Sequence, residues 1–260
     1  MTSLAADIGG TFSRLSWPFP GGSEEQRFSN ADFESLEAVI DHGMALRGIA
    51  GEAIDEMVLA LPGPIHVDPV VLTNINWRVQ RAALQHRYGV RLLTIVNDFQ
   101  AAALGAIAEP YDRLKVLNAA TPDDGPVVVA GAGTGLGMAW LPSADVGGLP
   151  RATEGGHLDF APNSARELAL LRWLSERYGH VSYERILSGD GLLDTYRFFA
   201  GGGGQAATPA QIKALADSGD GSAGDAIRLF VDVFAGYAGN LALAFNPGAG
   251  IYLCGGLTAH

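Results

Sequence analysis

The chain has 260 residues, enough for one large α/β domain or two lobes, and 48% of them are hydrophobic. Its net charge of −11 argues against binding to nucleic acid or to an anionic membrane, because both partners require a basic face. The single cysteine, Cys254, excludes an internal disulfide and a cysteine-rich zinc site. We find no signal segment at the start and no apolar run of about 18 residues, and we expect a cytoplasmic protein.

The first ninety residues show short apolar runs separated by glycine or proline turns. The turn Gly9-Gly10-Thr11 lies between two such runs, Asp32 is a candidate N-cap, and Gly89 is a candidate helix end. The predicted elements are strands at 4–8, 12–17, 57–61 and 70–72, helices at 33–44 and 79–88, and a loop at 18–22. Strands in series followed by alternation with helices predict an α/β fold with mixed sheets.

Residues 92–105 change character halfway. The first half is apolar and partly β-branched, as in a buried strand, and the second half is alanine-rich, as in a helix. Asn97 and Asp98 lie at the junction, and ligands of open α/β sheets bind at the carboxyl ends of strands. This stretch alone favours a helix N-cap over a catalytic base as the role of Asp98.

The second half continues the alternation of strands and helices. Thr208-Pro209 is a typical helix start, because proline suits the first helical position. The predicted elements are strands at 127–130, 138–141 and 251–254, and helices at 164–178, 189–199, from 208 onward, and 223–245.

A short internal repeat links the two halves. At a constant offset of 123 residues, Gly10 falls on Gly133, Thr11 on Thr134 and Trp17 on Trp140. Each copy has the order strand, glycine-threonine turn, strand, which suggests two lobes of similar build. Such turns expose backbone N–H groups that can hold phosphate oxygens, although an ordinary hairpin would look the same. Neither turn is a P-loop or a dinucleotide fingerprint.

Acidic side chains accompany these turns. Asp7 precedes the first turn, where a carboxylate beside phosphates would suit Mg²⁺, and the alternative is a solvated turn residue. Glu154 and His157 lie three residues apart on a glycine-rich loop and could bind sugar hydroxyls or a metal, although no further ligand cluster lies nearby in the sequence. Glu184 is a further candidate, with a surface pair to Arg185 as the alternative.

Several motifs together resemble one family along nearly the whole chain. These motifs are Asp7-Ile8-Gly9-Gly10-Thr11 with Arg14, Leu72-Thr73-Asn74 with Trp77, Asn97-Asp98-Phe99, the glycine-rich run 131–137, Glu154-Gly155-Gly156-His157 with the residues up to Pro162, the run from Glu184 to Gly189, and Gly250 with Gly255-Gly256. With them the chain resembles the bacterial ATP-dependent glucokinases of the hexokinase/actin/Hsp70 superfamily.

The resemblance implies a role for each motif. Asp98 would be the base for the 6-hydroxyl of glucose, and Asn97, Glu154, His157 and Glu184 would bind the sugar together with it. ATP would bind to Gly9, Gly10 and Thr11, to Gly133, Thr134 and Gly135, and to Gly255 and Gly256, with Asp7 positioning Mg²⁺.

The implied fold is the two-lobed, actin-like (ribonuclease H-like) ATPase fold, with a central cleft, usually as a homodimer. We expect a small lobe at 1–108 and a large lobe at 109–260. The related repressor/open-reading-frame/kinase branch is disfavoured, because it carries a zinc-binding cysteine cluster after the histidine and the only cysteine here is far away.

Chains of this family continue for some tens of residues beyond the Gly-Gly turn, whereas this sequence ends at His260. We therefore expect nucleotide binding to be weakened more than sugar binding. The alternative function is a catalytically impaired homologue that binds sugar or nucleotide. The sequence leaves open glucose against mannose or glucosamine, and ATP against polyphosphate.

Overall fold

The structure, a computed structural model, describes residues 2–72, 75–143 and 148–258. It consists of two compact units, unit 1 at Met1–Ala102 and unit 2 at Ala103–His260. The division falls within helix α3 (Asp98–Ala108), and the lobe boundary expected after residue 108 stays a prediction.

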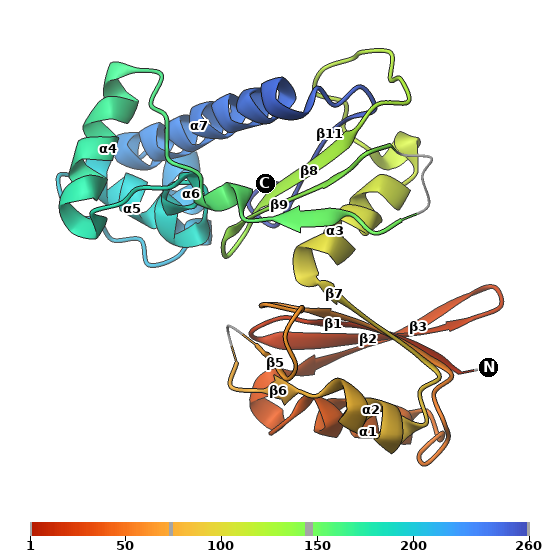
Figure 1. Cartoon of the computed structure of the whole chain (residues 1–260). Helices are drawn as coiled ribbons and strands as arrows, with labels where there is room; N and C mark the ends of the chain where they lie inside the picture. Colours follow the sequence, from red (N-terminus) through yellow and green to blue (C-terminus); the bar gives the residue numbers. More distant parts are fainter. Residues whose placement is uncertain (1, 73–74, 144–147, 259–260) are drawn as a thin grey trace. The chain divides into compact units, whose positions relative to one another are not determined.

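The sheet of unit 1 has the strand order β3-β2-β1-β4-β7. Strands β1, β2 and β3 are antiparallel neighbours, whereas β4 and β7 run parallel to β1. Helices α1 (Leu36–Leu46) and α2 (Arg81–Tyr88) cover one face of this sheet (Figure 1). The strands are β1 (Ser3–Ile8), β2 (Phe12–Phe19), β3 (Gly22–Ser29), β4 (Glu56–Leu61) and β7 (Leu92–Asn97), with a separate short pair β5 (Val70–Val71) and β6 (Arg78–Val79).

Strand β3 was not expected, and the loop predicted at 18–22 is only the turn at Pro20 and Gly21. Strand β2 continues through Pro18 and Phe19, and Gly22 already begins β3. The cause is visible in the composition of β3, which is polar, mostly exposed and without apolar alternation. Its backbone pairing with β2 along its whole length stabilises it, and that pairing cannot be predicted from side-chain pattern.

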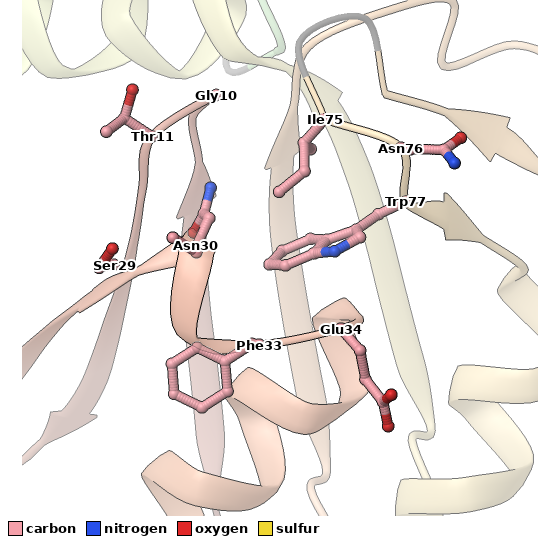
Figure 2. Close-up of a pocket in the computed structure, with 10 residues that line it drawn as sticks. Gly10, Thr11, Ser29, Asn30, Phe33, Glu34, Ile75, Asn76 and Trp77 are labelled. Atoms are coloured by element: carbon pink, nitrogen blue, oxygen red, sulfur yellow. The ribbon is translucent and has the colours of Figure 1, made fainter.

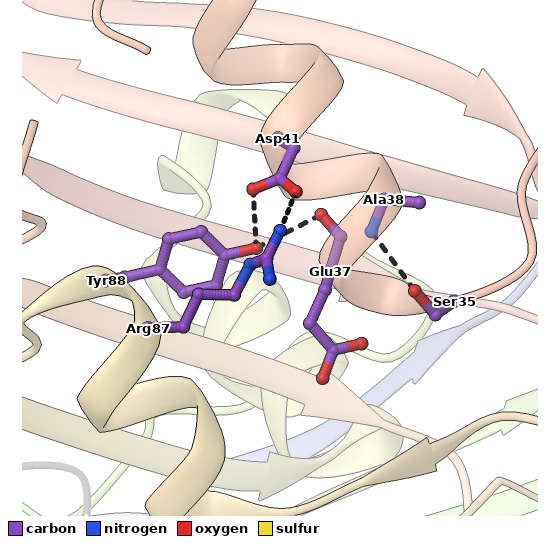
Figure 3. A network of polar contacts seen from close by, with 6 residues as sticks. All are labelled: Ser35, Glu37, Ala38, Asp41, Arg87 and Tyr88. Atoms are coloured by element: carbon purple, nitrogen blue, oxygen red, sulfur yellow. Dashed lines mark hydrogen bonds and ion pairs between the residues drawn. The ribbon is translucent and has the colours of Figure 1, made fainter. Parts of the chain in front are cut away.

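Helix α1 begins later than its apolar spacing suggested. Ser35 is the N-cap, and its Oγ accepts a hydrogen bond of 3.2 Å from the N–H of Ala38 (Figure 3). Asp32, the expected cap, lies instead in a short 3-10 helix at Asn30–Asp32. The prediction that Gly89 ends α2 is confirmed, since it adopts the left-handed conformation at the C-cap.

Polar contacts join α1 to α2 (Figure 3). The Oη atom of Tyr88 lies 2.9 Å from Oδ1 of Asp41 and 3.1 Å from the carbonyl oxygen of Glu37. Arg87 also donates a hydrogen bond to Asp41. Burial and the bond to Asp41 raise the pKa of Tyr88, so its hydroxyl remains a donor at neutral pH.

The sheet of unit 2 has the order β10-β9-β8-β11. Strands β8, β9 and β10 are antiparallel neighbours, and β11 runs parallel to β8. Its strands are β8 (Val127–Ala132), β9 (Leu136–Leu141), β10 (Arg151–Thr153) and β11 (Gly250–Cys254). Only β10 was not expected, because three residues are too short to show a period.

The helices of unit 2 agree with the expected ranges. They are α4 (Ala165–Tyr178), α5 (Gly189–Phe199), α6 (Pro209–Asp217) and α7 (Gly221–Phe245). Thr208 and Gln211 form a capping box at the start of α6. Helix α7 is long and apolar enough to cross a membrane by length and composition alone, but α5 and α6 pack on it and one face lies in the core.

Each unit has its own hydrophobic core. The core of unit 1 forms around Leu4, Ile8, Trp17 and Met57, and that of unit 2 around Val128, Leu170 and Tyr237.

The two glycine-threonine hairpins, β1–β2 and β8–β9, have the same order of strand, turn and strand but differ in the length of the turn. Ile8 pairs with Ser13 in the first hairpin, whereas Ala132 pairs with Leu136 in the second, so the second turn is one residue shorter.

Candidate active site

Helix α3 is capped at its junction with β7 by Asn97. The Oδ1 atom of Asn97 accepts a 2.8 Å hydrogen bond from the N–H of Phe99, and Oε1 of Gln100 accepts one of 2.8 Å from the N–H of Asn97. Oδ1 of Asp98 also lies 2.8 Å from the N–H of Phe99. The reciprocal cap therefore belongs to Asn97, and the spacing Asn-x-x-Gln could have revealed it. Because the oxygen of Asn97 faces the helix, its NH₂ group is the donor that a ligand could use.

Asp7 and Asn97 lie at the carboxyl ends of their strands, on the same side of the unit 1 sheet. The register pairs Asp7 with Ala60 on β4, and the next residue of β4, Leu61, with Asn97 on β7. Two strand spacings separate β1 from β7, which places their backbones about 10 Å apart. Asp7 is partly exposed, as a solvated residue would be, but it also forms a 3.1 Å ion pair with Arg14 across the hairpin.

The turn Gly9-Gly10-Thr11 is held by Asn30, which sequence reasoning missed. Nδ2 of Asn30 donates to the carbonyl of Gly9 at 2.8 Å, and its backbone N–H donates to the carbonyl of Thr11 at 2.9 Å. Its Oδ1 accepts a 2.7 Å hydrogen bond from Ser13. Asn30 and Ser13 are both buried, so these bonds fix the turn from the inside. No spacing rule links residue 30 to residue 9, since their proximity depends on the unexpected strand β3.

A pocket of about 540 Å³ lies beside this turn in unit 1 (Figure 2). The ring of Trp77 and the side chain of Ile75 face Asn30 and Phe33 across it. Thr73 and Asn74 of the expected Leu-Thr-Asn motif lie outside the described residues. The lining residues are Gly10, Thr11, Ser29, Asn30, Ala31, Phe33, Glu34, Ile75, Asn76 and Trp77.

The second glycine turn is closed by its own backbone and by helix α5. The N–H of Gly133 donates to the carbonyl of Gly135 at 2.8 Å, and the N–H of Gly189 donates to the carbonyl of Gly133 at 2.9 Å. Gly255 lies against the start of the same turn, because a Cβ atom on it would be 2.4 Å from the carbonyl oxygen of Ala132. The turn at Gly255-Gly256 therefore adjoins the Gly133–Gly135 turn within unit 2.

Glu154, His157 and Glu184 lie together in unit 2. Nε2 of His157 is 3.9 Å from Oε2 of Glu154, and Nδ1 of His157 is 3.8 Å from Oε1 of Glu184. Glu154 and His157 are exposed, with 92% and 57% of their side-chain surfaces accessible, whereas Glu184 is only 32% accessible. Among the described residues no group of three or more His, Cys, Asp or Glu side chains could hold a metal ion.

Glu184 does not form the surface pair with Arg185 that was its alternative interpretation. Its Oε2 accepts a 2.9 Å hydrogen bond from the N–H of Leu136, the residue after the second glycine turn. The guanidinium of Arg185 instead lies over the ring of Tyr178, 4.4 Å from its centroid. Sequence reasoning could not find the contact with Leu136, because the two residues are 48 positions apart.

The expected site residues thus fall into two groups. Asp7, the first glycine turn, Asn97 and Asp98 belong to unit 1, and Glu154, His157, Glu184 and the two other glycine turns belong to unit 2. Within each unit the structure brings the members of the group to one edge of the sheet or to one turn. That the two groups form one site stays a prediction.

Known proteins resemble this chain along almost all of its length. A family model described as Glucokinase matches residues 4–260. A glucokinase from Chromohalobacter salexigens is 36% identical over 260 residues, which cover 98% of this chain and 82% of the relative. The structure of a glucokinase from an Antarctic psychrotroph matches with a TM-score of 0.85 and 29% identity, covering 98% of this chain and 83% of the other.

A glucokinase from Balamuthia mandrillaris matches with a TM-score of 0.79 and 24% identity over 98% of this chain and 79% of the other, which supports the fold alone. The motifs, the fold and the family match therefore agree, and the chain belongs to the glucokinase family of ATP-dependent hexose kinases.

Proposed function

We propose that this chain transfers the γ-phosphoryl group of ATP to the 6-hydroxyl of glucose, using the residues located above. The observation that carries the proposal is the group of Glu154, His157 and Glu184, which adjoins the second glycine turn through Leu136. A cluster of hydrogen-bonding groups suited to sugar hydroxyls beside a turn suited to phosphate is what a sugar kinase requires.

The sugar is bound by groups that accept and by groups that donate hydrogen bonds. The carboxylates of Glu154 and Glu184 accept from sugar hydroxyls, His157 can do either, and the NH₂ of Asn97 donates. Hydroxyl groups need both kinds of partner, and a site that satisfies them discriminates strongly against analogues that lack one. The relative from Chromohalobacter salexigens, which is 36% identical, is a glucokinase, and this favours glucose as the sugar here.

Asp98 is the general base of the proposed reaction. Its position in the first turn of α3, directly after strand β7, holds the carboxylate on a rigid element. It orients the 6-hydroxyl and accepts its proton as the hydroxyl oxygen forms a bond to the γ-phosphorus. The bond from that phosphorus to the bridging oxygen breaks, and ADP leaves with the electron pair. Positioning and charge neutralisation supply most of the remaining catalysis.

The nucleotide lies on the three glycine turns in this proposal. The turns at 9–11 and 133–135 bind phosphates through backbone N–H groups, and Gly255-Gly256 lies against the adenosine. Mg²⁺, when bound, neutralises charge on the transferred phosphoryl group and the leaving ADP. Asp7 would hold such an ion, because its carboxylate is accessible to solvent and could exchange its ion pair with Arg14 for Mg²⁺, which commonly takes one or two protein carboxylates.

Several broader properties belong to the same proposal. The chain would adopt the two-lobed actin-like fold with a central cleft. The repeated strand order, β3-β2-β1-β4 in one sheet and β10-β9-β8-β11 in the other, supports two units of similar topology. Assembly as a homodimer and a cytoplasmic location also remain predictions.

A coupled assay of ADP production tests the function. The purified chain, MgATP and glucose should yield ADP at a rate that depends on glucose and falls to background without it. Mannose, glucosamine and polyphosphate, tested in parallel, define the selectivity. Glucose binding by calorimetry without glucose-dependent ADP production would instead identify a sugar-binding homologue that has lost catalysis.

A further inference from the structure

Leu136 follows the second phosphate turn and contacts the segments that carry the proposed sugar ligands of unit 2. Its N–H donates a 2.9 Å hydrogen bond to Oε2 of Glu184, and it directly follows Gly135 of the turn. Its carbonyl oxygen faces Gly156, in the middle of the loop that carries Glu154 and His157. Both polar groups of a single peptide residue therefore contact the sugar side of the site.

The neighbouring glycines show how closely these segments approach. A Cβ atom added to Gly135 would lie 2.6 Å from Oε2 of Glu184, and one added to Gly156 would lie 2.0 Å from the carbonyl oxygen of Leu136. Neither distance leaves room for a methyl group. The carboxylate and the sugar-binding loop are thus packed directly on the backbone of the turn.

We propose that Glu184 is a positioning residue for the second phosphate turn as well as a ligand of the sugar. Oε2 holds the backbone at Leu136 and so sets the orientation of the Gly133–Gly135 turn, while Oε1 faces His157 and the sugar. This inference rests on the proposed function, in which the turn binds nucleotide phosphate. It adds that the sugar and phosphate subsites of unit 2 share one carboxylate.

This sharing couples the two substrates energetically. A hydrogen bond to an ionised acceptor is stronger than one between neutral groups, so loss of the carboxylate releases a contact that positions the turn. A sugar that fixes the Glu184 side chain also favours the arrangement of the turn that binds phosphate. Linkage then requires that nucleotide strengthens sugar binding by the same factor.

Nucleotide binding without any sugar separates this role from a sugar-binding role. We would measure the affinity of the non-hydrolysable analogue AMPPNP with Mg²⁺ by calorimetry, in the absence of glucose, on the full chain. Glu184→Ala should weaken AMPPNP by about tenfold, in line with the loss of a charge-assisted hydrogen bond. Glu184→Gln should recover nucleotide affinity to within about threefold, because its amide oxygen can still accept from Leu136.

His157→Ala is the matched control, because it removes a neighbouring sugar ligand that has no hydrogen bond to the turn among the described contacts. It should weaken glucose binding and leave AMPPNP affinity within about twofold of wild type. If Glu184→Ala unfolds, as judged by circular dichroism, Glu184→Asp replaces it, since its carboxylate is one methylene shorter and withdraws from Leu136.

The outcomes of this experiment are distinct. Wild-type AMPPNP affinity in a folded Glu184→Ala or Glu184→Asp variant would overturn the positioning role and leave the proposed function standing. Unchanged glucose affinity in both His157→Ala and Glu184→Ala would overturn the proposed sugar site itself. Equal loss of AMPPNP affinity in His157→Ala and Glu184→Ala would also count against the inference, because the effect would then not depend on the bond to Leu136.

Discussion

The two glycine turns of this protein are similar hairpins that are held in different ways. In unit 1 the buried amide of Asn30 holds the Gly9–Thr11 turn, and Asp98 lies two strands away from it at the end of β7. In unit 2 the carboxylate of Glu184, itself a proposed sugar ligand, holds the Gly133–Gly135 turn. The first turn is therefore not hydrogen-bonded by any of the proposed sugar ligands of unit 1 among the contacts described, whereas the second turn is hydrogen-bonded by a proposed sugar ligand of unit 2.

The difference suggests that the two turns respond differently when sugar binds. A turn fixed by a neutral, buried amide has the same shape whether or not sugar is present. A turn fixed by a partly exposed carboxylate can respond to whatever binds that carboxylate. Four substitutions, two of them paired with a control substitution, test this comparison.

The largest effect is expected from Asp98→Asn. Loss of a positioned general base should lower kcat by at least about a hundredfold, with glucose affinity within an order of magnitude of wild type. Because Asp98 is remote from the Gly9–Thr11 turn along the sheet, AMPPNP affinity without sugar should not change. Steady-state kinetics and calorimetry measure both, and a kcat close to that of wild type would remove Asp98 from the mechanism.

Asn30→Ala should loosen the turn of unit 1 from the inside. It leaves the buried hydroxyl of Ser13 without its present partner, at a cost of about 1–3 kcal/mol, and it also frees the partly buried carbonyl of Gly9. We expect a lower melting temperature and a raised KM for ATP, with glucose affinity unchanged.

Asn76→Ala is the matched control for Asn30→Ala, because Asn76 lines the same pocket but is exposed. It should leave the melting temperature and both KM values within error. Equal effects of the two substitutions would show that the pocket, and not the clamp on the turn, is responsible.

Gly135→Ala tests the close packing of the second turn. A Cβ atom there would lie 2.6 Å from Oε2 of Glu184, the end of a side chain that can turn away, so the expected cost is that of the lost hydrogen bond to Leu136, about 1–2 kcal/mol. Gly133→Ala is the control for stability, because a Cβ atom added to Gly133 would have no neighbour within 4 Å and the φ of Gly133 is not in the left-handed region. Thermal unfolding should therefore show a decrease for Gly135→Ala and little change for Gly133→Ala, and equal melting temperatures would contradict the packing.

The smallest effect is expected from Tyr237→Phe in the core of unit 2. The hydroxyl of Tyr237 is buried and has no hydrogen-bond partner among the described residues, and burial raises its pKa, so it stays neutral. Removing it should leave stability unchanged or raise it by up to about 1 kcal/mol. Chemical denaturation measures this difference, and a clear loss of stability would reveal a partner for the hydroxyl.

The sequence predicts the apolar elements of this fold well, and it fails where tertiary pairing decides. Strands β1, β4, β7 and β8 and the four long helices of unit 2 follow from hydrophobic pattern and caps. Strand β3 does not, because its polar residues gain their conformation from pairing with β2. The motif residues of the site were likewise recognisable, whereas the contacts that hold them were not. Asn30 and Glu184 act across 21 and 48 positions, and no local rule of spacing relates such partners.

The two separate cores also determine how any unfolding experiment on this protein will look. With one core in each unit, thermal or denaturant unfolding can proceed in two steps rather than one. Trp17 and Trp77 report on the first unit, and Trp140 and Trp173 report on the second. A ligand that binds residues of one unit alone would shift the transition of that unit and leave the other in place. Calorimetry with each substrate would therefore identify which half of the molecule that substrate contacts.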